Sequence, residues 1–157
     1  MNLVAIYAGI LGTFIMTLFV EFTAYISRKP FHVVSILCSM LTFGEEMSTT
    51  NKRVIYLVAL LVHYSIGVIF SYCFELCLDY NLLALNLSNV LIFGGIAGLI
   101  GITGWRTFFA IHPSPPKINL SQYLTIIWIG HILYATGVFW TYLTLSSKPV
   151  EAFIPIC

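Results

Sequence analysis

The apolar residues of this chain fall in long unbroken runs rather than in an alternation of apolar and polar positions. A hydrocarbon core of about 30 Å needs about 20 residues at 1.5 Å per residue, so a helix of that length can cross a bilayer. Four runs are long enough: residues 2–27, 54–78, 87–111 and 120–145. The pattern predicts an all-α fold, a four-span transmembrane helical bundle that forms a single membrane domain over residues 1–157.

The segment between the first two runs has a helical periodicity instead. Over residues 32–46, polar residues recur at steps of three and four, and apolar residues such as Val34 and Leu37 fill the other side. The polar positions are His32, Ser35, Ser39, Thr42 and Glu46. This pattern predicts an amphipathic interfacial helix that lies in the headgroup plane.

The basic residues predict the orientation of the spans, because Lys and Arg are enriched in cytoplasmic loops. Six of the seven lie in the segments between spans one and two or around the end of span three: Arg28, Lys29, Lys52, Arg53, Arg106 and Lys117. Lys148 alone lies on the other side. Both termini are therefore predicted to face away from the cytoplasm.

Composition supports a lipid environment and excludes several classes of function. Only 8% of the residues are charged, against about 25% in soluble domains. The net charge of +1 argues against nucleic acid as a partner. The four cysteines have no metal-binding spacing and are interpreted as packing residues. The chain contains no Gly-x-Ser-x-Gly, phosphate-loop or His-Glu-x-x-His motif, so no feature specifically indicates an enzyme.

The first run carries a polar stripe of Thr13, Thr17, Glu21 and Tyr25, each four residues after the last. Steps of four keep side chains near one helix face. Glu21 lies seven residues before Arg28, roughly 10 Å inside the cytoplasmic boundary at 1.5 Å per residue. An ionisable residue at that depth indicates a function or a buried partner. The structural alternative is that Glu21 is protonated or extends toward Arg28.

Two histidines lie at matched depth, His63 in the second run and His131 in the fourth. Three interpretations stay open. The rings could ligate the iron of a haem b from both sides. With Glu21, and with Thr17 and Tyr25 on its stripe, they could bind a ligand or relay a proton. Each ring could instead hydrogen-bond a neighbouring helix as polar glue.

Glycine is concentrated in the third run. Gly94 and Gly98, with Gly101 one turn further, have the small-residue spacing that lets helices approach closely. These residues are therefore predicted to serve helix packing. Glu75 and Asp79, near the end of the second run, are expected to reach water.

From His63 onward the chain resembles the small bacterial inner-membrane proteins grouped as YagU-like. The resemblance covers roughly residues 63–142. It is carried by His63, Phe70, Tyr72-Cys73, Glu75, Gly95, Ala97-Gly98, Pro115-Pro116 and Gly130-His131. The chain departs from the pattern in a shorter first cytoplasmic loop and a short, nearly uncharged tail. The resemblance implies a four-helix protein of the bacterial inner membrane and supplies no mechanism.

The leading functional hypothesis is a non-enzymatic membrane protein with an intramembrane polar site, made by Glu21, His63 and His131. This site would bind or relay a proton, an ion or a small ligand, and it requires the three side chains to converge. One alternative is an electron carrier with haem b between His63 and His131. Another is an accessory subunit that docks on a membrane-protein partner, and a homo-oligomer is compatible with either alternative.

Overall fold

The computed structural model describes residues 3–42 and 49–146, and this part of the chain forms five helices and no strand. They are α1 (Leu3–Ser27), α2 (Val33–Leu41), α3 (Thr49–Asp79), α4 (Leu87–Ile111) and α5 (Leu120–Leu145). All except α2 are long and apolar enough to cross a membrane. The prediction of an all-α four-span bundle is therefore confirmed, and the chain is a multi-pass membrane protein whose environment is a lipid bilayer.

The helix bounds agree with the apolar runs except at the start of α3, which begins at Thr49 rather than at residue 54. The added turn contains Lys52 and Arg53, which the apolar criterion rejects although they are good helix formers. With 31 residues, α3 is about 46 Å long at 1.5 Å per residue. This length exceeds the hydrocarbon core, so α3 continues as a helix beyond it.

Asparagine side chains begin the last two helices. Asn86 Oδ1 accepts a hydrogen bond from the backbone N–H of Asn89 at 2.9 Å, and Asn119 Oδ1 accepts one from Gln122 at 3.2 Å. Such caps satisfy amide groups that have no partner within the helix. They fix the starts of α4 and α5 at the predicted positions.

The interfacial helix is shorter than predicted. α2 ends at Leu41, where the Thr42 N–H bonds the Cys38 carbonyl, and residues 43–46 of the predicted helix lie outside the described residues. Its apolar side is buried against the bundle, where α2 packs on α3. His112 Nε2 lies 3.0 Å from the Met40 carbonyl and ties α2 to the loop after α4. We call this end of the molecule the α2 end.

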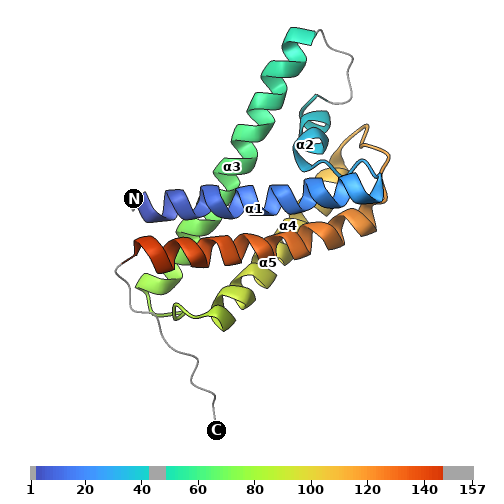
Figure 1. Cartoon of the computed structure of the whole chain (residues 1–157). Helices are drawn as coiled ribbons and strands as arrows, with labels where there is room; N and C mark the ends of the chain where they lie inside the picture. The colour runs from blue at the N-terminus through green and yellow to red at the C-terminus, as the bar shows by residue number, and fades with distance from the viewer. Residues whose placement is uncertain (1–2, 43–48, 147–157) are drawn as a thin grey trace.

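The long helices are arranged around α5, which runs antiparallel to α1 and packs on α1 and on α4 (Figure 1). α3 also packs on α1, at Gly9 and Thr13, and crosses it at an angle (Figure 1). The first residues of α1 and the last of α5 lie at the same end of the bundle, away from α2 (Figure 1). α3 and α5 therefore run in the same direction.

Backbone contact between α1 and α3 fixes their crossing point. A Cβ atom on Gly67 would lie 1.8 Å from Thr13 Oγ1, and one on Gly9 would lie 2.5 Å from Val68 Cα. Only glycine allows this approach. From α5, Tyr134 Oη donates a 2.6 Å hydrogen bond to the Gly67 carbonyl, and its ring lies beside Gly12 of α1. We call this point the Gly67 crossing, and it divides the space between α3 and α5 into two halves.

The glycines of α4 fall into two groups. Cβ atoms on Gly94, Gly98 and Gly101 would meet atoms of α5 at 2.6–2.7 Å, so these three residues let α4 and α5 approach closely. Cβ atoms on Gly95 and Gly104 would have no atom within 4 Å. This second group therefore allows substitution without a clash.

Candidate functional site

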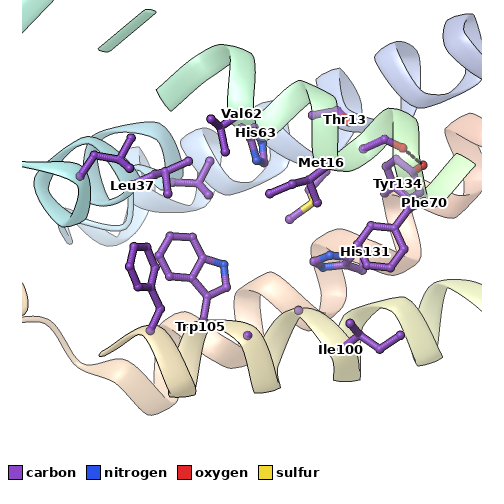
Figure 2. A pocket seen from close by; sticks show the side chains of 17 residues that line it. Thr13, Met16, Leu37, Val62, His63, Phe70, Ile100, Trp105, His131 and Tyr134 are labelled. Carbon is purple, nitrogen blue, oxygen red and sulfur yellow. Dashed lines mark hydrogen bonds between the residues drawn. The ribbon is translucent and has the colours of Figure 1, made fainter. Parts of the chain in front are cut away.

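A cavity of about 420 Å³ lies on the α2 side of the Gly67 crossing (Figure 2). Side chains from all five helices line it, and most of them are apolar. α2 closes one end of the cavity with Val33, Leu37 and Leu41. The polar groups that line the cavity include the His63 and His131 rings. The two histidines that the sequence singles out therefore share one site.

The hydrogen-bond network assigns the tautomer of His63. Thr17 Oγ1 donates its proton to the Thr13 carbonyl at 2.7 Å, so the 3.0 Å bond between Thr17 Oγ1 and His63 Nε2 must be donated by the ring N–H. In a neutral imidazole the second nitrogen, Nδ1, is then an acceptor. Thr17 thus positions the ring and leaves an acceptor nitrogen on it.

His131 has the opposite tautomer for the same reason. Its Nδ1 lies 2.8 Å from the Ile127 carbonyl, which can only accept, so Nδ1 carries the proton and Nε2 is the acceptor. The ring edge lies against α4, where a Cβ on Gly101 would be 3.0 Å from Nε2 and 2.7 Å from Cε1. Phe70 of α3 meets the same ring edge-on, with centroids 6.1 Å apart. Gly101 therefore serves the site as well as the packing.

The two rings project toward the cavity from opposite walls, His63 from α3 and His131 from α5 (Figure 2). Each neutral ring uses its N–H within the protein and keeps one acceptor nitrogen. Such a pair can accept hydrogen bonds from a ligand, or bind a proton. Hydrogen bonding to a neighbouring helix explains the N–H bond of His63 to Thr17 but not that of His131, which stays within α5. It also leaves both acceptors and the cavity unexplained.

The structure does not bring Glu21 or Tyr25 into this site. Glu21 Oε2 lies 2.6 Å from His32 Nδ1, and both side chains are partly exposed. The chain turns back after α1 and places His32, the first residue before α2, beside Glu21. Tyr25 is 81% exposed and points away from the bundle. The predicted convergence of Glu21 with the two histidines is therefore wrong, because the turn after α1 supplies a nearer partner.

A second carboxylate, Glu75, was expected to reach water and does not. Its side chain is only 4% exposed, whereas Asp79 one turn later is exposed. Glu75 continues a line of small and polar residues on α3, with Gly67 and Ser71 at steps of four. That spacing was the available sequence signal, equivalent to the polar stripe of the first span. The prediction that Glu75 reaches water relied only on its distance from the helix end, and it was wrong.

The haem alternative stays a prediction. Iron held from both sides would use the two acceptor nitrogens, about 2 Å from the metal each, by analogy with other imidazole–metal bonds. In Figure 2 the Met16 side chain lies between the two rings, so a macrocycle would have to displace it. Met16 is 5% exposed and forms part of the packed core.

Among the described residues, no group of three or more His, Cys, Asp and Glu side chains is placed to hold a metal ion. The function is therefore inferred from the two imidazoles and the apolar cavity that they line. Comparison with protein-family models, curated proteins and solved structures yields no match to this chain.

Proposed function

We propose that this protein binds a small lipophilic molecule with a hydroxyl group in the cavity between His63 and His131. The observation that carries the proposal is an apolar cavity lined by two imidazole rings, each of which keeps one acceptor nitrogen. Its volume of about 420 Å³ lies within the range of about 300–1,000 Å³ of ligand sites. One water occupies about 30 Å³ of liquid, so a single ion or proton would leave most of this space unused.

The walls of the cavity suggest that the ligand arrives from the bilayer. Ile66 of α3 and Ile100 of α4 line the cavity, yet they are 46% and 55% exposed on the surface of the bundle. In a membrane that surface faces lipid. A lipophilic molecule can therefore pass between α3 and α4 without crossing water.

The histidines determine which ligand is preferred. Two neutral rings that offer acceptors favour a ligand that donates, such as an alcohol or a phenol. An equally apolar ligand without a donor leaves the acceptors unpaired in an apolar site, at a cost of about 1 kcal/mol or more. This difference corresponds to roughly fivefold in affinity.

Trp105 provides a direct assay, because it lines the cavity whereas Trp128 and Trp140 are exposed. In a Trp128→Phe/Trp140→Phe background, Trp105 is the single tryptophan. We expect 4-bromophenol to quench its fluorescence saturably in nanodiscs, because bromine quenches indole at contact. The methyl ether 4-bromoanisole, which lacks the O–H, should bind more weakly, and His131→Leu, which removes one of the two acceptors, should reduce this difference.

Two glycines of α4 give a matched pair of variants. Gly104 lines the cavity and Gly95 does not, although a Cβ on either would meet no atom within 4 Å. Gly104→Leu should fill the cavity and abolish saturable quenching, whereas Gly95→Leu should leave it unchanged. Equal quenching in all variants would mean that the probe acts only from the lipid, and the proposal would fail.

An absorption spectrum separates this proposal from the haem b alternative. Protein purified after expression with a haem precursor should show no Soret band. A Soret band that disappears in His63→Ala and in His131→Ala would replace the ligand site with an electron carrier.

We place the protein in a bacterial inner membrane with both termini outside the cytoplasm, as the YagU-like resemblance and the basic residues suggest. The described basic residues lie toward the α2 end, at the end of α1, the start of α3 and from Arg106 to Lys117. The α2 end is then cytoplasmic. A homo-oligomer, or an accessory role beside a membrane-protein partner, stays a prediction from the sequence.

A further inference from the structure

A second group of polar side chains lies on the other side of the Gly67 crossing. Ser71 and Glu75 of α3 and Tyr142 of α5 are 0%, 4% and 0% exposed. Together with Tyr134, whose hydroxyl bonds the Gly67 carbonyl, they form what we call the polar seam. Buried polar groups inside a membrane are costly and indicate a function.

The polar seam lies where α3 and α5, which run in the same sense but cross at an angle, approach each other (Figure 1). Tyr134 faces Gly67, and eight residues further along each helix Tyr142 comes level with Glu75. The Phe74 and Tyr142 rings, 5.6 Å apart at 75°, fix this register. Ser71 lies midway, near the hydroxyls of both tyrosines. Glu75 lies within electrostatic range of the Tyr142 hydroxyl.

Two hydroxyls of the polar seam make no hydrogen bond among the described residues: Ser71 Oγ and Tyr142 Oη. Such groups are uncommon in folded proteins and usually have a specific reason. Packing alone would be served better by Ala and Phe, which have the same shapes without the unpaired hydroxyl. We therefore infer that these hydroxyls serve the exchange of protons along the polar seam rather than packing.

The two ends of the polar seam have different surroundings. At one end, Asp79 is exposed one turn beyond Glu75, at the close of α3. At the other end, Tyr134 lines the cavity together with His131, three residues earlier on the same helix. The polar seam thus leads from the membrane surface, opposite the α2 end, to the cavity that Tyr134 and His131 both line.

We propose that the polar seam is a proton path in which Glu75 is the proton-binding group. The Glu75 carboxyl gives its proton to Tyr142 Oη while that hydroxyl releases its own to Ser71 Oγ, and Ser71 passes one to Tyr134 in the same way. Each hydroxyl ends neutral. Tyr134 Oη turns from the Gly67 carbonyl and releases its proton to the neutral His131 ring, which becomes charged. Asp79 then restores one proton from water to the Glu75 carboxylate. Rotation of the Ser71 side chain between staggered positions closes the gap between the tyrosines.

Among the described residues, the titratable groups that act on the tyrosines of the polar seam include Tyr134 and Tyr142 themselves from α5, and Cys73, Glu75 and Asp79 from α3. α4 faces Phe74 with Phe93, which does not titrate. This inference relies on the proposed ligand site only for the use of the proton, and its test needs no ligand.

Infrared spectroscopy of the purified protein tests the proton-binding group. On acidification, the carbonyl band of a buried protonated carboxyl should appear. This band should be lost in Glu75→Gln and kept in Glu21→Gln. It should shift in Tyr142→Phe, which removes a polar hydroxyl from the neighbourhood of the carboxyl, and stay in place in Ser65→Ala, an exposed serine of the same helix. Absence of a Glu75-dependent band, or its indifference to Tyr142→Phe, would overturn the proposal.

Histidine-labelled protein tests the connection to the cavity. Proton exchange at the His131 ring, followed by ¹⁵N magnetic resonance, should slow in Glu75→Gln and in Ser71→Ala but not in Glu21→Gln. Unchanged exchange in both polar-seam variants would refute the path. Failure of 4-bromophenol to bind would refute the ligand site alone, because neither the infrared nor the ¹⁵N measurement uses this ligand.

Discussion

The two halves of the space between α3 and α5 differ although the same two helices form them. On the α2 side of the Gly67 crossing there is a cavity with two histidines, and on the other side there is a closed seam with a buried carboxylate. Aromatic side chains bridge the helices in both halves, Phe70 against His131 in one and Phe74 against Tyr142 in the other.

The difference comes from what α4 presents to each half. Toward the cavity it offers Gly101 and Gly104, which have no side chain to fill the space. Toward the polar seam it offers Phe93, whose ring lies 5.0 Å from that of Phe74. A sequence of one helix thus determines whether the space between two others is open or filled. The comparison suggests that glycine in a membrane helix can make a cavity as well as a contact.

Gly67→Ala should have the largest effect, because Gly67 separates the two halves. The new methyl group would lie 1.8 Å from Thr13 Oγ1 and 3.1 Å from Thr13 Cβ. Overpacking of this kind costs about 1–3 kcal/mol, more than the gain from higher helix propensity, about 0.5–1 kcal/mol. Thermal unfolding in detergent measures the loss.

The control for this variant is Gly104→Ala, whose Cβ meets no atom within 4 Å. It should be as stable as the parent protein or slightly more stable. Equal stability of Gly67→Ala and Gly104→Ala would show that α1 and α3 do not touch at the crossing, and the division into two halves would be lost.

Tyr134→Phe should have the next largest effect, since it removes the 2.6 Å bond to the Gly67 carbonyl and keeps the ring. We expect a loss of about 1 kcal/mol in stability. The variant should also slow proton exchange at His131 in the ¹⁵N experiment. Tyr25→Phe is the control, because Tyr25 is 81% exposed. If Tyr134→Phe changed neither the stability nor the proton exchange at His131, the Tyr134 hydroxyl would link neither the two helices nor the two halves.

Thr17→Val should act on the cavity half alone. It removes the partner of His63 Nε2, and interhelical bonds of this type contribute about 0.6 kcal/mol in membrane proteins. The ¹⁵N shifts of His63 should change toward a mixture of tautomers, while those of His131, held by Ile127, should not. Thr23→Val is the control, because Thr23 Oγ1 bonds only the Phe19 carbonyl of its own helix. Unchanged His63 shifts would contradict the assigned tautomer.

The fold was predictable because length and hydropathy alone decide which segments can cross a bilayer. Three of the four spans match the apolar runs within one residue at each end, and only the start of α3 was missed. Its first turn is polar, and a helix outside the bilayer needs no apolar residues. Helix formation and membrane burial are thus separate properties, and the apolar run reports the second.

The candidate site was only partly predictable. Depth along a helix predicted that His63 and His131 share a level, and Thr17 was on the correct face of α1 to bond His63. Depth could not distinguish Glu21, which the turn after α1 brings to His32, from Glu75, which is buried by Tyr142 and its neighbours. That distinction depends on which helix packs opposite, and a single sequence does not contain this information. The volume of the cavity was unpredictable for the same reason.

Glu21→Gln should have the smallest effect and sharpens the comparison from outside both halves. Glu21 and His32 are partly exposed, with side-chain exposures of 40% and 46%, so the pair should contribute about 0.3 kcal/mol to stability. Quenching of Trp105 by 4-bromophenol and proton exchange at His131 should both match the parent protein. If Glu21→Gln altered either one, the carboxylate of α1 would have to act on the cavity from a distance. The site of Glu21, His63 and His131 that the sequence predicts would then account for the function better than the observed packing does.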